Sequence, residues 1–453
     1  MIEALRMNLD FRNIWRRQSV NRRIFSALIT VGALTLLVNL AATAKELVVA
    51  NQFGAGDALD ALLIAFLLPS YAINVLAGSC STALVPTFVQ VRENEGQEKA
   101  QQLLSEVIIG ITVVLAVLSV LLGLTASFIL PLLGSGFSIS KLVLTRSLFF
   151  VFLPILVISG IKMTWAAVLN ACERFALAAL SPGMIPLATI AMLLLMGKTW
   201  GIYALAAGTL SGYVIEAGLL GWGLRRNGFC LTPHWRGLDH ALRKVIKQYI
   251  PVVAGALLMC GTMLVDQSMA AVLGAGSVST LNYGGKVITL ILGIGSVSLS
   301  TAIFPHFSRM VAVYDWAGIR HTLKTYTYLI LIVTIPLTLI LVYFSAPLVR
   351  LLFERGAFTS MDTWRVSQVQ ALFLLQLPFY FTVILTVRLI SSLKMNRILM
   401  QAAVINIFSK TILNYFLMKR LEVAGIALST TLVYMISLIY CSTMLYRQIK
   451  TLG

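Results

Sequence analysis

Apolar residues form long unbroken runs along this chain, and polar residues gather in the short stretches between them. The runs are about 20 residues long, which is the length that an α-helix needs to cross a bilayer. The short alternating segments of a membrane β-barrel do not appear. The pattern therefore predicts an all-α polytopic membrane protein with about twelve transmembrane helices. The predicted spans cover residues 24–44, 60–85, 106–133, 147–169, 175–196, 201–223, 249–273, 280–305, 325–349, 368–393, 398–418 and 422–446.

Three short motifs occur twice, and one offset of 219 or 220 residues relates each pair. The pairs are Ser81–Phe88 with Ser300–Phe307, Phe53–Gly56 with Leu273–Gly276, and Gly136-Phe137 with Gly356–Phe358. A constant offset of about half the chain indicates an internal duplication. In membrane transporters, such repeats form two bundles with the substrate path between them. We therefore predict two similar six-helix lobes, residues 24–223 and 249–446.

The remaining segments are short and basic. Residues 1–23 are predicted to form a cytoplasmic N-terminal segment, either a short interfacial helix or a topogenic tail. Residues 224–248 join the lobes, and their second half has helical spacing of Leu242, Val245 and Ile246. This half is either an amphipathic linker on the cytoplasmic surface or the early start of the seventh span. Residues 447–453 form a cytoplasmic tail.

Composition and charge agree with a membrane protein. The chain is 58% hydrophobic and only 11% charged, with a net charge of +18. Of its 35 Lys and Arg residues, 22 fall in the segments that this topology places inside. Because positive residues gather on the cytoplasmic side, both termini are predicted to be cytoplasmic. The positive charge therefore reflects topology and attraction to membrane lipids, and we expect no nucleic-acid partner.

The residues that catalysis would need are not arranged for it. The five cysteines are scattered without a CxxC motif, and the four histidines lack ligand spacing. No phosphate-binding glycine loop, nucleophile elbow or zincin motif occurs, so we expect no enzyme, no catalytic residues, no metal site and no cofactor. A long soluble domain for ATP hydrolysis is missing too. Energy would come from an Na⁺ or H⁺ gradient, or from the later fate of the substrate.

Charged residues inside the predicted spans are the candidate functional residues. Each costs at least about 2.5–3.5 kcal/mol on insertion scales. Lys45, Glu46, Asp60, Asp266 and Lys286 lie near the outer ends, Lys162, Glu216 and Arg388 toward the inner ends, and Lys410 near the middle of its helix. Lys162 and Arg388 are close enough to a helix end to snorkel. For Lys45 and Glu46, the alternative is a simple pair at the water boundary.

Lys286 has the most informative neighbours, because Gly284 and Gly285 precede it. Glycines let a helix bend and expose backbone beside the cation. A lysine in such a place suits a phosphate as a compact point charge. Asp266 and Asp60 would then be its counter-ions, although Asp266 could instead hold a coupling Na⁺ or H⁺. A purely structural ion pair is the alternative.

Three stretches resemble the MviN/MurJ family of lipid II flippases. Phe53–Gly56 with Asp60 and Leu84–Pro86 is similar to the family's amino-terminal signature. Gly276–Ser279, with Tyr283 and Lys286, resembles its junction of spans 7 and 8, and Leu351–Thr359 resembles its most recognisable outer loop. The resemblance implies the two-lobe fold of the multidrug and oligosaccharidyl-lipid exporter superfamily. It also implies translocation of an undecaprenyl-pyrophosphate-linked saccharide across a bacterial inner membrane.

The chain also departs from the family pattern. The family has several cavity arginines in its first two spans, whereas Asn39, Lys45, Ile73 and Asn74 stand in the matching stretch. Lys286 stands where the family has arginine, which keeps the charge but loses the bidentate fork. The family's last two spans, which are associated with the lipid tail, are not expected here. These departures favour the repeat unit of another surface polysaccharide, with lipid II as the other possible cargo.

The sequence thus predicts a flippase of lipid-linked saccharides that works by alternating access. Lys286 and Lys45 are the predicted pyrophosphate ligands, with Lys410 and Lys162 as weaker candidates. Asp266 and Asp60 are predicted as counter-ions or coupling-ion ligands. Cell-envelope biosynthesis enzymes are possible partners. A small-molecule antiporter of the same fold would depend on Asp266 more than on any lysine. A non-transporting scaffold for cell-wall assembly would tolerate loss of all three charges at Lys286, Lys45 and Lys410.

Overall fold

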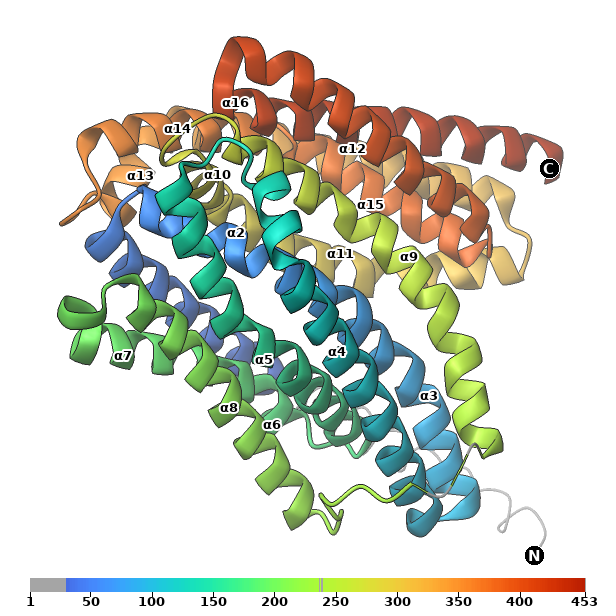
Figure 1. The fold of residues 1–453 in the computed structure, drawn as a ribbon. Coiled ribbons are helices and arrows are strands. Elements are labelled where there is room, and N and C mark those ends of the chain that lie inside the picture. Colours follow the sequence, from blue (N-terminus) through green and yellow to red (C-terminus); the bar gives the residue numbers. More distant parts are fainter. Residues whose placement is uncertain (1–29, 236, 238, 453) are drawn as a thin grey trace, which may run out of the picture. The chain divides into compact units, whose positions relative to one another are not determined.

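The computed structural model describes residues 30–235, 237 and 239–452. The predicted basic segment 1–23 lies outside these residues. The first described helix covers Thr30–Phe53. The others, shown in Figure 1, are α2 (Asp57–Ala72), a π-helical turn (Ile73–Ala77), α3 (Gly78–Glu95), α4 (Gln97–Leu133), α5 (Ile139–Ala171), α6 (Phe175–Leu180), a 3₁₀ turn (Ser181–Gly183), α7 (Met184–Trp200), α8 (Ile202–Arg226), α9 (His240–Ala271), α10 (Ser277–Gly284), α11 (Lys286–Ala312), α12 (Trp316–Tyr343), α13 (Ser345–Phe353), α14 (Ser360–Leu374), α15 (Leu377–Ser392) and α16 (Asn396–Leu452).

Eleven helices in the described residues are long and apolar enough to cross a membrane. The predicted last two spans both fall in α16, whose helix is interrupted at Glu422 with φ 49° and ψ −132°. A Cβ on Gly425 would lie 2.5 Å from the backbone of Leu417, so the chain reverses sharply between the two halves of α16. Two spans therefore fit within α16, in agreement with the predicted twelve. The all-helical membrane fold predicted from the apolar runs is confirmed.

Several predicted boundaries differ from the structure. The first helix continues to Phe53 instead of ending near residue 44, and Lys45 and Glu46 pair within it at 2.8 Å. The helical half of the predicted linker is the beginning of α9, which starts at His240 and runs without a break into the apolar span. Leu242 and Val245 are buried there. This half of the segment is thus helical and continuous with the helix of the seventh span.

The chain divides into two compact units. The first comprises residues 30–48, 76–119 and 154–249 of the described chain. Its tightest helix pair is α7 with α8, where Gly208 and Gly212 stand four residues apart on α8. Cβ atoms on these glycines would lie 2.8 Å from Thr189 Cα and 2.6 Å from Ile185 Cα of α7. Small residues at this spacing let two membrane helices approach closely, which is how they associate where no hydrophobic effect drives them together.

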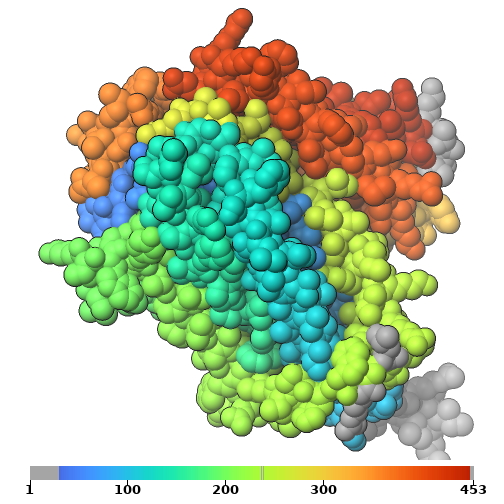
Figure 2. All heavy atoms as spheres, in the orientation of Figure 1, coloured from blue at the N-terminus to red at the C-terminus, as the bar shows by residue number. Residues whose placement is uncertain are grey.

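The second unit comprises residues 49–75, 120–153 and 250–452. Helix α15 packs against α11, α12 and α16, as Figure 1 shows. The core includes Leu374, Leu377, Leu385 and Leu389, all with no exposed surface. In Figure 2 the red spheres of α16 form part of the surface of this unit. The unit joins segments from both halves of the sequence, because residues 49–75 and 120–153 belong to the first repeat.

The repeated glycine motifs meet one another inside the second unit. Gly54, at φ +56°, approaches the carbonyl of Ala357, and the Ala357 amide donates to the Asn51 carbonyl at 2.8 Å. Gly356 lies against the carbonyl of Asn51, and the equivalent contact of the other repeat is present, because Gly136 lies against the carbonyl of Ala271. A side chain at any of these glycines would collide with the facing backbone, so only glycine permits these approaches. We call these contacts, with that of Gly276 described below, the repeat junction.

Candidate functional site

A carboxylate completes the repeat junction. Asp60 on α2 is fully buried, and its two oxygens accept hydrogen bonds from the backbone amides of Gly276 and Ser279, each at 2.7 Å. These amides begin α10, where unpaired donors and the helix dipole favour a negative group. Gly276, at φ +76°, also meets the carbonyl of Ala55. Asp60 thereby joins the two repeats through the backbone.

Lys141 provides the positive charge at this junction. Its ammonium lies 2.9 Å from Asp60 and 2.5 Å from Asp57, and only 8% of its side chain is exposed. The ammonium also lies 3.9 Å from the centre of the Phe137 ring. The sequence analysis missed this residue, because the fifth helix begins at Ile139 and not near residue 147. Its position just after the repeated Gly136-Phe137 motif is the signal that would have identified it.

The first unit contains a buried ion pair that is separate from the junction. Lys162 on α5 lies 2.5 Å from Glu216 on α8, with 11% and 5% of the two side chains exposed. The ammonium also lies 4.3 Å from the centre of the Tyr213 ring. A cation in this position gains from the ring as well as from the carboxylate. Lys162 is therefore held inside the unit and does not snorkel to its surface.

The second unit contains a cavity of about 550 Å³ among α9, α11, α15 and α16, whose mostly apolar lining includes a cluster of charged and polar side chains. Asp266 of α9 lies 3.2 Å from the ammonium of Lys410, and the Asn414 amide donates to Asp266 at 2.8 Å. Lys410 also donates to the Ile426 carbonyl at 3.3 Å and to the Thr430 hydroxyl. The Lys410 ammonium is thus surrounded by a carboxylate, a carbonyl and a hydroxyl oxygen. These partners stabilise the buried positive charge of Lys410, whose position in the middle of a helix the sequence alone does not explain.

Arg388 lines the same cavity and was not among the predicted site residues. Its Nε donates to the Ser300 hydroxyl at 2.9 Å, and it therefore reaches across from α15 to α11. Ser300 begins the second copy of the repeated STA motif. Tyr380 and Tyr434 also line the cavity, with their ring centres 5.1 Å apart. The cavity can hold an anionic or hydrogen-bonding group of moderate size.

The predicted site residues are distributed over several places. Lys45 pairs with its neighbour Glu46, and Lys162 pairs with Glu216. The two carboxylates predicted as counter-ions of Lys286 hold other lysines, since Asp60 binds Lys141 and Asp266 binds Lys410. Lys286 itself is half-buried at the first residue of α11, directly after Gly285.

The repeated helices, the buried ion pairs and the internal cavity define a polytopic membrane transporter built from a duplicated unit. The chain belongs to the lipid II flippase MurJ family, whose model matches residues 49–453. The members of this family are transporters of the cytoplasmic membrane and not enzymes. The resemblance found in the sequence is therefore confirmed, together with the multi-pass membrane location.

Individual relatives are distant but match most of the chain. A probable lipid II flippase MurJ from Buchnera aphidicola subsp. Acyrthosiphon pisum is 24% identical, covering 94% of this chain and 84% of the relative. The lipid II flippase MurJ of Burkholderia cenocepacia is 26% identical, covering 77% and 69%. Two solved structures share the fold. A lipid II flippase MurJ in an inward closed conformation has a TM-score of 0.80 at 24% identity, covering 92% of this chain and 87% of the other. An inward-facing multidrug resistance MATE family transporter has a TM-score of 0.70 at 15% identity, covering 94% and 98%.

Proposed function

We propose that this protein moves an undecaprenyl-pyrophosphate-linked saccharide from the inner to the outer leaflet of the cytoplasmic membrane. The observation that carries this proposal is the family match over residues 49–453. It favours lipid II over the repeat unit of another polysaccharide, although the cavity arginines expected of the family are missing from the first two spans. The enzymes that make and polymerise lipid II are then the expected partners. The distribution of Lys and Arg supports cytoplasmic placement of both termini.

Alternating access requires contacts between the repeats that can separate. The repeat junction suits this role, because it consists of glycine–backbone contacts and of hydrogen bonds to one carboxylate. The same region contributes Phe137, Ala271 and Val278 to the apolar core of the unit, so the polar contacts are the part of the junction that water can replace. Asp60 and Lys141 carry opposite charges, which water could solvate once the junction parts. In this mechanism the junction is the gate on the outer side.

Lys286 is the leading candidate for the pyrophosphate. It follows Gly285, where α10 passes into α11, and its ammonium suits a phosphate as a compact point charge. Lys45, Lys162 and Lys410 each hold a carboxylate. A phosphate would reach these three by displacing Glu46, Glu216 or Asp266, and we propose them as further ligands.

Asp266 acts in this account as a counter-ion and not as a ligand of a coupling cation. Lys410 places its ammonium against the Asp266 carboxylate, the Ile426 carbonyl and the Thr430 hydroxyl. A sodium ion would need the same oxygens. The ammonium thus provides the positive charge that a bound Na⁺ or H⁺ would otherwise supply, and the driving force would come from the downstream use of the cargo.

The proposal is tested with purified protein in liposomes that contain fluorescent lipid II in the inner-facing leaflet. The parent moves lipid II to the other leaflet, where a membrane-impermeant reagent detects it. Lys286→Ala lowers the initial rate by at least about tenfold, since one charge-assisted contact contributes about 1.5–3 kcal/mol. Lys286→Arg keeps most of the rate. Lys419→Ala removes an exposed lysine of α16 and serves as the matched control. Parent-like transport by Lys286→Ala would contradict this role of Lys286, and no transport by the parent would contradict the function.

A further inference from the structure

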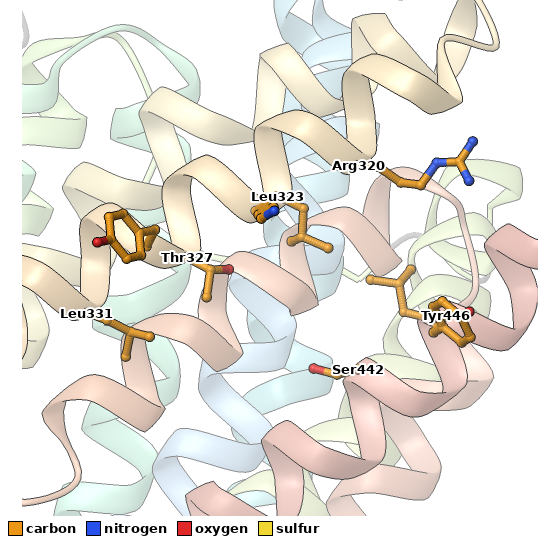
Figure 3. A pocket seen from close by; sticks show the side chains of 9 residues that line it. Arg320, Leu323, Thr327, Leu331, Ser442 and Tyr446 are labelled. Atoms are coloured by element: carbon orange, nitrogen blue, oxygen red, sulfur yellow. The ribbon is translucent and has the colours of Figure 1, made fainter.

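A second cavity lies on the second unit, between α12 and the C-terminal part of α16. Its volume is about 780 Å³, within the usual range of small-molecule sites. Figure 3 shows it from close by, with residues of both helices facing each other across the groove. The groove is lined by Arg320, Leu323, Lys324, Thr327, Tyr328, Leu331, Ser442, Leu445 and Tyr446. None of these residues lines the cavity that contains Asp266.

The residues that line the groove lie on one face of each helix, as their spacing along the sequence shows. Those of α12 recur at intervals of three and four residues from Arg320 to Leu331, so they form one face of that helix. Those of α16 have the same spacing, from Ser442 to Tyr446. Leu445 is only 2% exposed and lies at the bottom of the groove. Tyr328 and Tyr446, which are 69% and 70% exposed, stand at its edges.

The groove is cationic at one end and apolar along its length. Figure 3 shows Arg320 and Tyr446 at one end and Leu331 at the other. Lys324 follows Arg320 by one helical turn. Both cations lie in the N-terminal third of α12, which covers Trp316–Tyr343. The carboxylate of Asp315 beside them caps the helix by accepting from the Gly318 amide at 2.8 Å.

The dimensions match one leaflet of a bilayer. From Arg320 to Leu331 the helix rises about 16 Å at 1.5 Å per residue. Half of the hydrocarbon core is about 15 Å thick. Other basic side chains are exposed at this end of the groove, because α16 reverses at Glu422 and so brings Arg397, near its start, back toward Arg447, which follows Tyr446. The groove therefore runs from a basic headgroup level toward the middle of the membrane.

We propose that this groove binds an anionic glycerophospholipid. One acyl chain lies along Leu323, Leu331 and Leu445, and the phosphate lies between Arg320 and Lys324. The hydroxyls of Thr327 and Ser442, which point toward the groove in Figure 3, face the ester region of such a lipid. The two cations and the absence of a carboxylate among the lining residues favour an anionic over a zwitterionic headgroup. This site is additional to the proposed cargo path, and its function does not depend on the identity of the cargo.

The test is native mass spectrometry of the delipidated full-length protein with phosphatidylglycerol and phosphatidylcholine of identical acyl chains. Each basic residue near an anionic lipid contributes about fivefold, so the two cations predict a preference of roughly 30-fold for phosphatidylglycerol. Arg320→Gln with Lys324→Gln removes this preference. Arg397→Gln with Arg447→Gln removes two exposed cations at the same end of the unit that do not line the groove, and it keeps the preference. Equal losses in the two double variants would show nonspecific charge attraction and overturn the site.

A second pair of variants tests the apolar part of the groove. Ser442→Trp fills the space between the helices and lowers the occupancy of both lipids by at least about fivefold. Thr443→Trp places the same side chain at the next, exposed position outside the groove and leaves the occupancy unchanged. Unchanged binding in Ser442→Trp would overturn the proposal. Displacement of phosphatidylglycerol by equimolar undecaprenyl phosphate would also overturn it, since the groove would then be a site for the carrier lipid.

Discussion

The buried pair of Lys162 and Glu216 gives a sharp prediction about stability. At 2.5 Å and an effective dielectric constant of 20, the attraction between unit charges is about 7 kcal/mol. Removing the two ions from water costs several kcal/mol for each of them, and the two contributions nearly cancel. We therefore expect the pair to add little net stability compared with apolar side chains of similar size. Loss of one partner alone should be far more costly.

The perturbation is a double-mutant cycle of Lys162→Met and Glu216→Leu. Each single variant leaves one charge in a site where at most 11% of the side chain is exposed, and it should lose about 3–5 kcal/mol of unfolding free energy. The double variant should lie within about 1 kcal/mol of the parent. Unfolding in mixed micelles, titrated with a denaturing detergent and followed by tryptophan fluorescence, measures all four proteins.

Lys45→Met is the matched control, because Lys45 and Glu46 form a pair that is more exposed, at 27% and 18%. It should lose less than about 1 kcal/mol, since a partly hydrated carboxylate remains stable alone. Additive losses at Lys162 and Glu216 would refute the reasoning, because they would show that each side chain contributes independently of its partner. A translocation assay on the stable double variant then shows whether Lys162 serves the cargo, and a tenfold slower rate is expected if it does.

Two further predictions concern the second unit. Gly276→Ala should destabilise the repeat junction more than Gly274→Ala does, because both glycines have positive φ but only Gly276 faces backbone, at the Ala55 carbonyl. Hydrogen exchange at the Ser279 amide should therefore be faster in Gly276→Ala alone. Equal exchange in the two variants would contradict this prediction. Lys410→Ala should leave a set of oxygens around Asp266 that binds Na⁺. Added Na⁺ should therefore raise the melting temperature of the variant but not that of the parent protein. Stabilisation of the parent by Na⁺ would contradict the role assigned to the Lys410 ammonium.

Much of the fold follows from hydropathy and from the internal repeat. The apolar runs located the membrane helices to within several residues in most cases, because a span must hide its backbone from lipid. The shared offset identified Gly54 with Gly274, Gly56 with Gly276, and Gly136 with Gly356 as equivalent positions. It did not reveal that these motifs contact one another. The interruption of α16 at Glu422 was predicted only as a short connection between two spans.

The site was harder to predict, because a single sequence does not show which distant residues form ion pairs with each other. Lys162 and Glu216 were both recognised as charges inside spans, but nothing in their positions shows that α5 and α8 bring them together. Lys141 was assigned outside the membrane, because its helix begins before its apolar run does. The partners of Asp60 at Gly276 and Ser279 are backbone amides, which every residue except proline offers.

The most direct test of the central claim is mass spectrometry of lipid-linked saccharides in cells depleted of this protein. The account predicts that lipid II accumulates, with its headgroup retained on the cytoplasmic side, while levels of other undecaprenyl-linked saccharides stay unchanged. Accumulation of a different undecaprenyl-linked unit would contradict the cargo. Unchanged levels of every lipid-linked saccharide would contradict the flippase function itself.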